Sequence, residues 1–450
     1  MPTSAGSSAI AAPVQQSERI SILDSLRGFA ILGILLMNIP GFAIPLQGHD
    51  PSLLNETGWN YYLWYVVQLI PHGTQRALFS MLFGAGIILF INSRENKPAQ
   101  TSHIDYFFRR QLWLMAFSVF DVWLLLWPGD ILLDYALLGL LMVSFRNLPP
   151  KKLLIGAAVC ISLMTLRNNL DLYQHKKIIS RGEAVALMDT NITKLNPIQK
   201  SDINAMEDFK KFESREAKLE RREKAILITS EGSYERLAER RTKAYTDNLA
   251  RYLYFELWDV LLFMFIGMAF FKMGILTGKA PVKVYLWMCL IGMSLGFSIM
   301  YTRLEFTIAS GFDDFNYTKM VSFDLYEPGR LLRALGIFGF IMLLYKSGWF
   351  KWLFAIMRAP GQMAFTNYLM QSLICAIIFY SIGFKLYGKL ERNEVYLTVL
   401  AIWIFQIIFS HIWLRFFRFG PFEWLWRSLT YWKRQPMLKQ YSMPAVNAIA

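Results

Sequence analysis

The stretch ISILDSLRGFAILGILLMNIPGFAI, residues 20–44, decides the fold, because it is long and apolar enough to cross a membrane as a helix. It nevertheless carries Asp24, Arg27 and Asn38. Asp24 and Arg27 are three residues apart and share a helix face, so the simplest interpretation is an ion pair near one helix end. Asn38 follows Arg27 by eleven residues, which places it about 16 Å further along the helix. An amide at that depth either bonds to a neighbouring helix or has a functional role.

The composition of the whole chain agrees with a membrane environment. Of the 450 residues, 54% are hydrophobic and 18% are charged, and the mean hydropathy is +0.31. Soluble domains have roughly 25% charged residues. Apolar runs of helix length recur without the period-two alternation of barrel strands, so the predicted fold class is all-α, a polytopic integral membrane protein in a lipid bilayer. About ten spans are predicted, at roughly 20–45, 75–92, 106–127, 130–146, 152–169, 252–273, 282–302, 329–346, 362–384 and 395–417.

The distribution of Lys and Arg predicts the orientation of these spans. Basic residues are frequent in the loops after the second, fourth, sixth and eighth spans and in the C-terminal segment, all of which fall on one side if the helices alternate. Basic loops stay in the cytoplasm, so both termini are predicted to be cytoplasmic. The net charge of +14 then reflects topology, and nucleic-acid binding is not predicted.

One segment differs from the rest, since residues 171–250 are rich in charges of both signs. Phe212, Leu219 and Ile226 recur every seven residues and SEGS at 230–233 marks a turn, which predicts an outward-facing helical hairpin. A solvated spacer explains the composition equally well. The predicted organisation is a polar tail (1–18), a first membrane bundle (19–170), the hairpin (171–250), a second bundle (251–417) and a basic cytoplasmic tail (418–450).

A second polar cluster lies in IPHGTQRALFSMLFGAG, residues 70–86. Pro71 and Gly73 interrupt the helical pattern, and a broken helix at membrane depth is tolerated where it lines a polar cavity. His72 is then a candidate general base near neutral pH, and Arg76 is a candidate partner for an anionic group. The alternative is a loop histidine and an arginine at the membrane interface.

Further acidic side chains lie in LLLWPGDILLDYALLGLL, residues 124–141. Asp130 is placed to cap the helix that follows, whereas Asp134, one turn later, has no such explanation. Together with Arg330 and other charges near predicted outer helix ends, they indicate a polar cavity open to the outside, although snorkelling explains single arginines. The three cysteines all fall in predicted spans, so neither a disulfide framework nor a metal site is predicted.

Two C-terminal runs, APGQMAFTNYLMQSLICAIIFYSIGF and IWIFQIIFSHIWLRFFRFGPFEWLWRSLTYWKRQPM, resemble the C-terminal region of a bacterial membrane protein family known as domain of unknown function 418, or YeiB-like. The runs LDSLRGFAILGILLMN, LFSMLFGAG and GDILLDYALLGLL are also similar to it. The resemblance covers the chain except for its polar start and residues 171–250, and it implies the cytoplasmic membrane of a bacterium. That family resembles, more distantly, the transmembrane acyltransferases, which include the acyltransferase-3 proteins and the lysosomal heparan glucosaminide N-acetyltransferase.

The distant resemblance implies acyl transfer across a membrane. Those enzymes use cytoplasmic acyl-CoA to acylate an acceptor on the far side, which here implies an envelope glycan or lipid, and they share an Arg-Gly motif on the first helix. Acyltransferase-3 proteins place an essential His eleven residues after that Arg. The corresponding residue is Asn38, so that base is not carried over and His72 is the substitute. An amide can still donate a hydrogen bond to a thioester or its oxyanion.

The resulting hypothesis is a transmembrane acyltransferase with acyl-CoA as donor and no permanently bound cofactor. The catalytic candidates are His72, Asn38 and Asp134, the candidates for donor binding are Asp24, Arg27 and Arg76, and those for substrate binding are Asp130, Arg330, Asn367 and Gln371. Two other functions stay open: a transporter of a small anionic or amphipathic solute, with the buried charges as its pathway, and a scaffold that recruits an envelope partner through the hairpin. The oligomeric state is not indicated by the sequence.

Overall fold

The computed structural model describes residues 20–48, 50–95, 103–188 and 195–439, and within these ranges the regular secondary structure is helical, without a β-strand. The predicted polar tail, residues 1–18, lies outside them. The longer helices are α1 (Ser21–Ala43), α3 (Thr74–Glu95), α4 (His103–Val119), α6 (Pro150–Ala186), α7 (Pro197–Glu213), α9 (Tyr234–Lys272), α10 (Val282–Ala309), α12 (Tyr326–Ser347), α14 (Ala364–Phe379) and α15 (Arg392–Phe416). The shorter helices are α2 (Gly58–Leu69), α5 (Leu132–Met142), α8 (Arg215–Ile226), α11 (Asp314–Met320), α13 (Lys351–Gln362) and α16 (Pro421–Tyr431). Short 3-10 or π turns are η2 (Pro45–Gly48), η3 (Pro51–Leu54), η4 (Phe120–Leu124), η5 (Val143–Phe145) and η6 (Leu227–Glu231).

Six helical segments of the described chain are long and apolar enough to cross a membrane, which confirms the all-α membrane fold. They are α1, Gly58–Asn92 (α2 with most of α3), α6, α10, α12 and α15, and a seventh results if α13 and α14, which meet at 76°, count as one span. The predicted number of ten spans is not confirmed. The predicted span 130–146 corresponds to α5, which has 11 residues and a length of about 17 Å, whereas the hydrocarbon core is about 30 Å thick. A hydropathy window counts apolar residues and does not detect where a helix ends.

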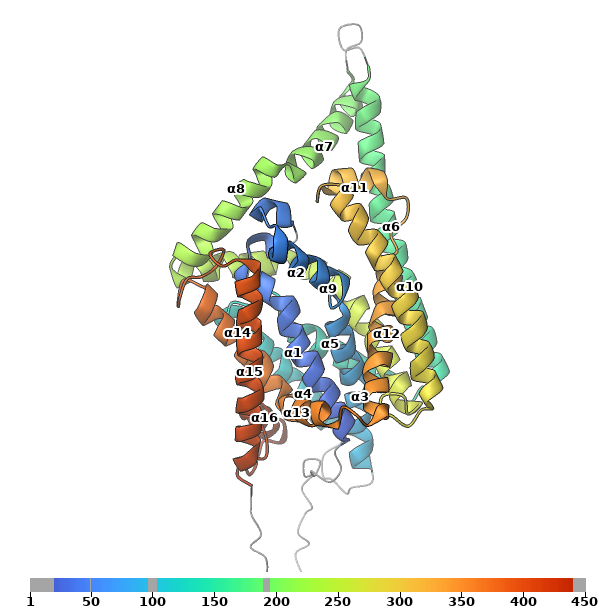
Figure 1. Cartoon of the computed structure of the whole chain (residues 1–450), viewed down its shortest axis with the longest axis vertical. Helices are drawn as coiled ribbons and strands as arrows, with labels where there is room; N and C mark the ends of the chain where they lie inside the picture. The colour runs from blue at the N-terminus through green and yellow to red at the C-terminus, as the bar shows by residue number, and fades with distance from the viewer. Residues whose placement is uncertain (1–19, 49, 96–102, 189–194, 440–450) are drawn as a thin grey trace, which may run out of the picture.

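The membrane helices approach one another closely at glycines. Gly292 on α10 lies against Gly336 on α12, and Gly84 on α3 and Gly267 on α9 lie against each other's helices. A Cβ atom at any of these positions would come within 2.0–2.6 Å of a backbone atom of the facing helix. Small residues allow such contacts, which replace the hydrophobic driving force that is absent between helices in lipid. The main apolar core lies between these helices and α1, which runs through the middle of the bundle (Figure 1).

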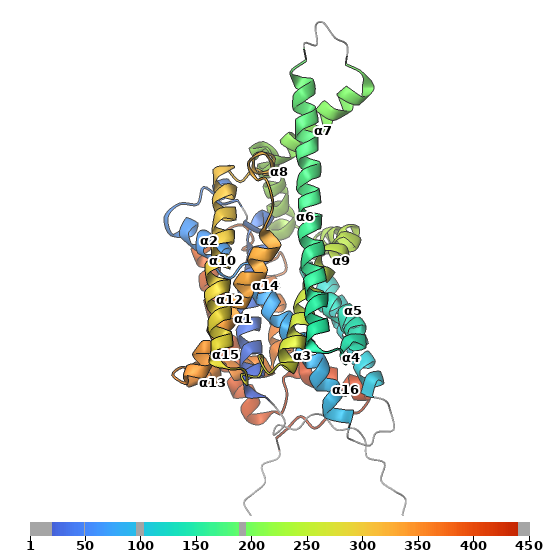
Figure 2. The same cartoon turned by 90° about the vertical axis from the view of Figure 1, so that its right-hand side faces the viewer.

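The charged insertion forms a helical arch at one end of the bundle (Figure 1, Figure 2). α6 continues beyond the bundle, and α7 and α8 return to its opposite edge, where Ala225 joins a buried apolar cluster with Phe42 and Phe379. The seven-residue spacing does not define one helix face, because Ser214 breaks the helix and caps α8, and Phe212 is 58% exposed. The predicted hairpin is therefore helical, but the chain that returns from α6 to the bundle is divided into α7 and α8. The end of α8 packs against the bundle.

The two ends of the described chain, Ile20 and Lys439, lie at the end of the bundle opposite to the arch (Figure 1). α13 and α16 lie at this same end. We call it the α16 end and the other the arch end. The predicted topology places the α16 end in the cytoplasm, and this orientation stays a prediction.

Candidate functional site

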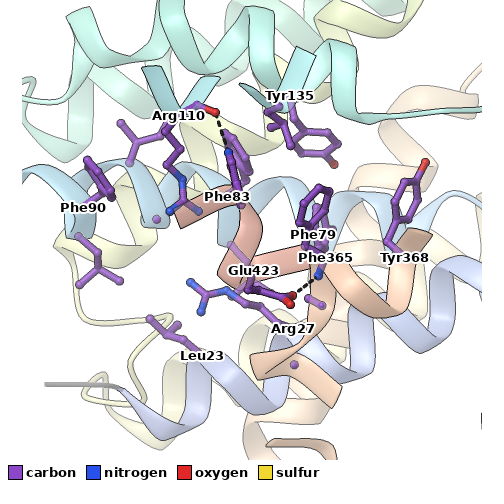
Figure 3. Close-up of a pocket in the computed structure, with 18 of the residues that line it drawn as sticks. Leu23, Arg27, Phe79, Phe83, Phe90, Arg110, Tyr135, Phe365, Tyr368 and Glu423 are labelled. Atoms are coloured by element: carbon purple, nitrogen blue, oxygen red, sulfur yellow. Dashed lines mark hydrogen bonds between the residues drawn. The ribbon is translucent and has the colours of Figure 1, made fainter. Parts of the chain in front are cut away.

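A cavity of about 530 Å³ lies between α1, α3, α4, α5, α14 and α16 (Figure 3). Most of its wall is apolar, with aromatic rings supplied by Phe79, Phe83, Phe90, Phe107, Phe365 and Trp426. Its volume falls in the range of small-molecule sites, roughly 300–1,000 Å³. A wall of this kind can hold a hydrocarbon chain away from water.

Three arginines, Arg27, Arg110 and Arg427, border the cavity at the α16 end. Arg27 forms an ion pair with Asp24 at 3.0 Å, and the guanidinium carbon of Arg110 lies 3.8 Å from the ring centroid of Trp426. Figure 3 shows the side chains of Arg27 and Arg110 directed towards the same part of the cavity. This end of the cavity therefore carries a positive charge that suits an anionic group.

Glu423 on α16 also borders the cavity, but its carboxylate is engaged in the structure of α14. One oxygen accepts hydrogen bonds from the backbone N–H groups of Phe365 (2.8 Å) and Thr366 (3.0 Å), and the other accepts one from the hydroxyl of Thr366. α14 has no side-chain cap from its own N-cap residue, Met363. Burial raises the pKa of Glu423, although its hydrogen bonds oppose the shift. Glu423 is thus a helix cap supplied by another helix.

Gln111 on α4 is a polar group of the wall that has no hydrogen-bond partner among the described residues. The residue is 0% exposed, and neither atom of its amide group is hydrogen-bonded to a described residue. Buried polar groups are nearly always paired, and leaving one unpaired costs about 1–3 kcal/mol. The amide of Gln111 is therefore available to hydrogen-bond a polar group or a water molecule in the cavity.

Two tyrosines, Tyr135 and Tyr368, line the part of the cavity farthest from Phe90 and Arg110 (Figure 3). The hydroxyl of Tyr135 lies 2.6 Å from that of Ser80, and Tyr368 donates a hydrogen bond to a carboxylate oxygen of Asp130 at 3.0 Å. Each hydroxyl therefore connects the cavity to a separate polar cluster.

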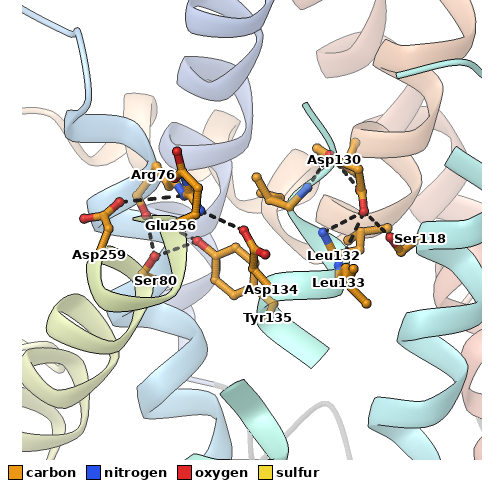
Figure 4. Close-up of polar contacts among 12 residues, drawn as sticks. Arg76, Ser80, Ser118, Asp130, Leu132, Leu133, Asp134, Tyr135, Glu256 and Asp259 are labelled. Carbon is orange, nitrogen blue, oxygen red and sulfur yellow. Dashed lines mark hydrogen bonds and ion pairs between the residues drawn. The ribbon is translucent and has the colours of Figure 1, made fainter. Parts of the chain in front are cut away.

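The cluster behind Tyr135 is built around Arg76 (Figure 4). Arg76 binds Asp134 at 2.9 Å, forms a second ion pair with Glu256, and lies 3.8 Å from Asp259. The side chain of Glu256 is 37% exposed and that of Arg76 is 23% exposed. Charged groups on membrane helices face a polar cavity and avoid lipid. Glu256 and Arg76 are therefore the part of this cluster that a polar molecule can reach.

The same network continues towards the arch end through Arg330 on α12. Arg330 binds Asp259 at 2.5 Å and Glu327 at 2.7 Å, and its side chain packs under Gly73 in the turn between α2 and α3. We call this set of charged residues the arginine–acid column. Its members are Arg76, Asp134, Glu256, Asp259, Glu327 and Arg330.

Five of the residues predicted from the sequence fall into these two places. Asp24 and Arg27 line the cavity, whereas Arg76, Asp134 and Arg330 belong to the column. Asp130 lies between them, bonded to Tyr368 and to the backbone N–H of Leu132, so the predicted cap of α5 is present.

Neither His72, the predicted base, nor Asn38, the predicted hydrogen-bond donor to the thioester, is among the described residues that line the cavity. His72 lies in the turn between α2 and α3, where its backbone carbonyl accepts a hydrogen bond from Arg333. Asn38 is half-buried, on the part of α1 nearer to the arch end. A catalytic role of His72 stays a prediction, and it requires a substrate that approaches from the arch end.

Asn367 and Gln371, which were predicted to bind substrate, connect helices. Asn367 donates a hydrogen bond to the carbonyl of Pro360 at 3.1 Å, which secures the break between α13 and α14. Gln371 donates to the carbonyl of Ile31 on α1 at 3.2 Å and to the side chain of Gln406 on α15 at 2.9 Å. In the described structure both amides position α14 and do not border the cavity.

Five residues of the cavity were missed in the sequence: Arg110, Gln111, Tyr135, Tyr368 and Arg427. Tyr368 and Arg427 stand inside the two C-terminal runs TNYLMQS and FEWLWRS, which was the available signal. Gln111 is a polar residue within the apolar run 106–127, a signal of the same kind as Asp24 in the first helix.

The fold and the site define an integral membrane protein whose helices enclose an apolar, arginine-bordered cavity joined to a partly buried column of charged residues. The chain belongs to the family described as protein of unknown function (DUF418), whose model matches residues 270–433. It is 30% identical to the uncharacterized protein YxaH of Bacillus subtilis (strain 168), over 95% of this chain and 98% of the relative. It is 29% identical to the uncharacterized protein YeiB of Escherichia coli (strain K12), over 94% of this chain and 100% of the relative. No solved structure matches the chain.

Proposed function

We propose that the protein is an acyltransferase of the bacterial cytoplasmic membrane. It takes an acyl group from a cytoplasmic thioester of the acyl-CoA class and transfers it to a hydroxyl or amine of an envelope glycan or lipid. The observation that carries the proposal is the junction of two unlike sites at Tyr135, where the apolar cavity ends and the arginine–acid column begins. A donor and an acceptor that approach from opposite faces of a membrane need such a junction.

The chemistry of the cavity suits the donor. Its apolar wall can hold an acyl chain, and guanidinium groups such as those of Arg27 and Arg427 match the oxygens of phosphate groups. The unpaired amide of Gln111 can donate a hydrogen bond to the thioester carbonyl, where negative charge develops during transfer. The ion pair with Asp24 holds Arg27 in position at the entrance.

The chemistry of the column suits a polar acceptor. Carboxylates accept hydrogen bonds from hydroxyl and amine groups, and Glu256 is the most exposed acid bound to Arg76. The partial exposure of Glu256 and Arg76 supports access from a water-filled opening. In this arrangement the acceptor enters from the arch end and meets the acyl group near Tyr135.

Binding and transfer by the purified full-length protein test the proposal. CoA and acyl-CoA are titrated by calorimetry, and transfer of a labelled acyl group to membrane extracts is measured. Arg427→Ala removes one positive charge at the cavity entrance and is expected to weaken acyl-CoA binding roughly tenfold to a hundredfold, because a hydrogen bond to a charged group contributes about 1.5–3 kcal/mol. Arg358→Ala, at an exposed arginine of α13, is the matched control and should leave the affinity unchanged.

Two results would contradict the proposal. If neither CoA nor any thioester of it binds, the cavity is not a donor site. If a solute crosses proteoliposomes that contain the protein and no covalent product forms, the protein is a transporter.

A further inference from the structure

The cluster behind Tyr368 is built on an irregular helix end. α4 ends at Val119 and is followed by the π turn η4, and Leu126 then has a left-handed backbone with φ of 57°. π turns are rare and occur frequently at functional sites. Asp121 lies in this turn.

Asp121 is buried without a partner for its charge. The residue is 0% exposed, and neither carboxylate oxygen is at hydrogen-bond geometry with a described residue. Asp130 lies beside it, and the neutral hydroxyl groups of Ser372 and Tyr368 are close enough to act as hydrogen-bond donors to its carboxylate. Within the described ranges no Lys or Arg forms an ion pair with Asp121 or Asp130, whereas the acids of the column are paired with Arg76 and Arg330.

Asp130, in contrast, is held by several donors (Figure 4). One carboxylate oxygen accepts hydrogen bonds from the hydroxyl of Ser118 and from the backbone N–H of Leu132 at 3.1 Å. The other accepts the hydrogen bond from Tyr368. Asp130 thus connects Asp121, which has no cationic partner among the described residues, with the hydroxyl of Tyr368, a residue of the cavity wall.

The surrounding titratable groups do not neutralise this pair. They are Tyr380, near Asp121, and Tyr245 and Asp134, near Asp130. Two arginines are named in these contacts, and one of them, Arg76, binds Asp134. The other, Arg241, donates to the carbonyl of Leu126 at 3.0 Å and to Tyr380 at 2.6 Å. Its hydrogen bonds therefore go to neutral oxygens.

Two carboxylates that are buried together without a cation do not both carry a charge, because an isolated buried carboxylate takes up a proton. We infer that Asp121 and Asp130 share one proton, and that this carboxyl pair receives the proton of the acceptor through the hydroxyl of Tyr368. Both acids act through Tyr368 and are positioning residues. The relay to the acceptor rests on the proposed acyl transfer, whereas the shared proton does not.

The transfer step balances as follows. The oxygen or nitrogen of the acceptor bonds to the thioester carbonyl carbon and gives its proton to the oxygen of Tyr368, which passes its own proton to Asp130. The pair now holds two protons. The carbon–sulfur bond breaks, and the thiolate leaves towards the α16 end and takes a proton from water. The pair then returns one proton to water, so the products are the acylated acceptor and the thiol.

Infrared spectroscopy of the purified full-length protein at neutral pH tests the shared proton, because a protonated carboxyl group has a C=O stretching band that a carboxylate lacks. The wild-type spectrum minus that of Asp121→Asn is expected to contain this band, with a shift in D₂O. Asp130→Asn gives a second, independent difference spectrum. Asp105→Asn, at an exposed acid of α4, is the matched control and should not change the band. Absence of the band from both difference spectra would overturn the inference.

Tyr368→Phe tests the relay, since it keeps the ring and removes the hydroxyl. General acid–base catalysis contributes typically 10²–10⁴-fold, so kcat should fall at least about a hundredfold. The affinity for acyl-CoA should be unchanged, and the carboxyl band should remain, shifted in frequency because Asp130 loses a hydrogen-bond donor. An unchanged kcat would refute the relay. If acyl-CoA does not bind at all while the band is present, the proposed function and the relay are wrong and the shared proton is confirmed.

Discussion

Gly84 and Gly86 are two residues apart on α3, and the structure predicts opposite effects of substituting them. A Cβ atom at Gly86 would meet nothing within 4 Å and would point into space at the cavity wall, whereas a Cβ at Gly84 would lie 2.4 Å from the carbonyl oxygen of Met264 on α9. Gly in a helix interior is less favourable than Ala by about 1 kcal/mol. Gly86→Ala should therefore stabilise the protein by up to that amount, and Gly84→Ala should destabilise it by about 1–3 kcal/mol through overpacking.

Gly86→Leu extends the comparison to binding. The leucine side chain would occupy cavity volume equivalent to about three methylene groups of an acyl chain, and each buried methylene contributes about 0.8 kcal/mol. The loss of about 2.4 kcal/mol corresponds to a roughly fifty-fold weaker affinity for a long-chain acyl-CoA. CoA without an acyl chain should bind the variant about as well as it binds the wild type.

Thermal unfolding in detergent, followed by circular dichroism, gives the order of stability, and calorimetric titration gives the affinities. Gly86→Ala serves as the control for Gly86→Leu, because it changes the same position and leaves most of the volume free. Equal destabilisation by the alanine substitutions at Gly84 and Gly86 would refute the packing argument. Undiminished binding of the long-chain thioester to Gly86→Leu would show that this cavity is not the acyl site.

Three further predictions concern contacts around the site. Gly28→Ala should lower the unfolding temperature, because its Cβ would lie 2.0 Å from the carbonyl oxygen of Met357 on α13; normal unfolding would contradict this packing. Glu423→Gln should cost about 1–2 kcal/mol of stability through the weaker cap of α14, and its effect should be non-additive with Thr366→Val in a double-mutant cycle. Arg241→Ala should increase hydrogen exchange in the arch half of α9 and leave acyl-CoA affinity unchanged, since its contacts are with the carbonyl of residue 126 and the hydroxyl of residue 380.

The sequence was a good guide to the membrane fold and to part of the cavity. Apolar runs of helix length are required by the bilayer itself, so they are visible without any knowledge of packing. Asp24 and Arg27 could be found because a charge inside an apolar run is costly and stands out. Arg76, Asp134 and Arg330 of the arginine–acid column were found for the same reason.

The remaining features depend on contacts between distant segments. Arg110 and Arg427 lie in basic regions near the α16 end, where the positive-inside rule already explains them, so a ligand-binding arginine cannot be told from a topological one. Asn367 and Gln371 stood out in an apolar run. A polar side chain between membrane helices, however, holds the helices together as often as it binds a ligand. The π turn at Asp121 has no local signal, because it arises where α4 meets α14 and the start of α5.

The cap that Glu423 forms on α14 has a consequence for inheritance within the family. Residues 366 and 423 are far apart in the chain, yet they form one joint between α14 and α16. In a relative that lacks the carboxylate at position 423, the first N–H groups of α14 have no acceptor. We expect such relatives to lack the hydroxyl at position 366 as well. The two C-terminal runs are therefore expected to covary. Relatives in which only one of the two runs has changed should have a different set of residues in the cavity wall.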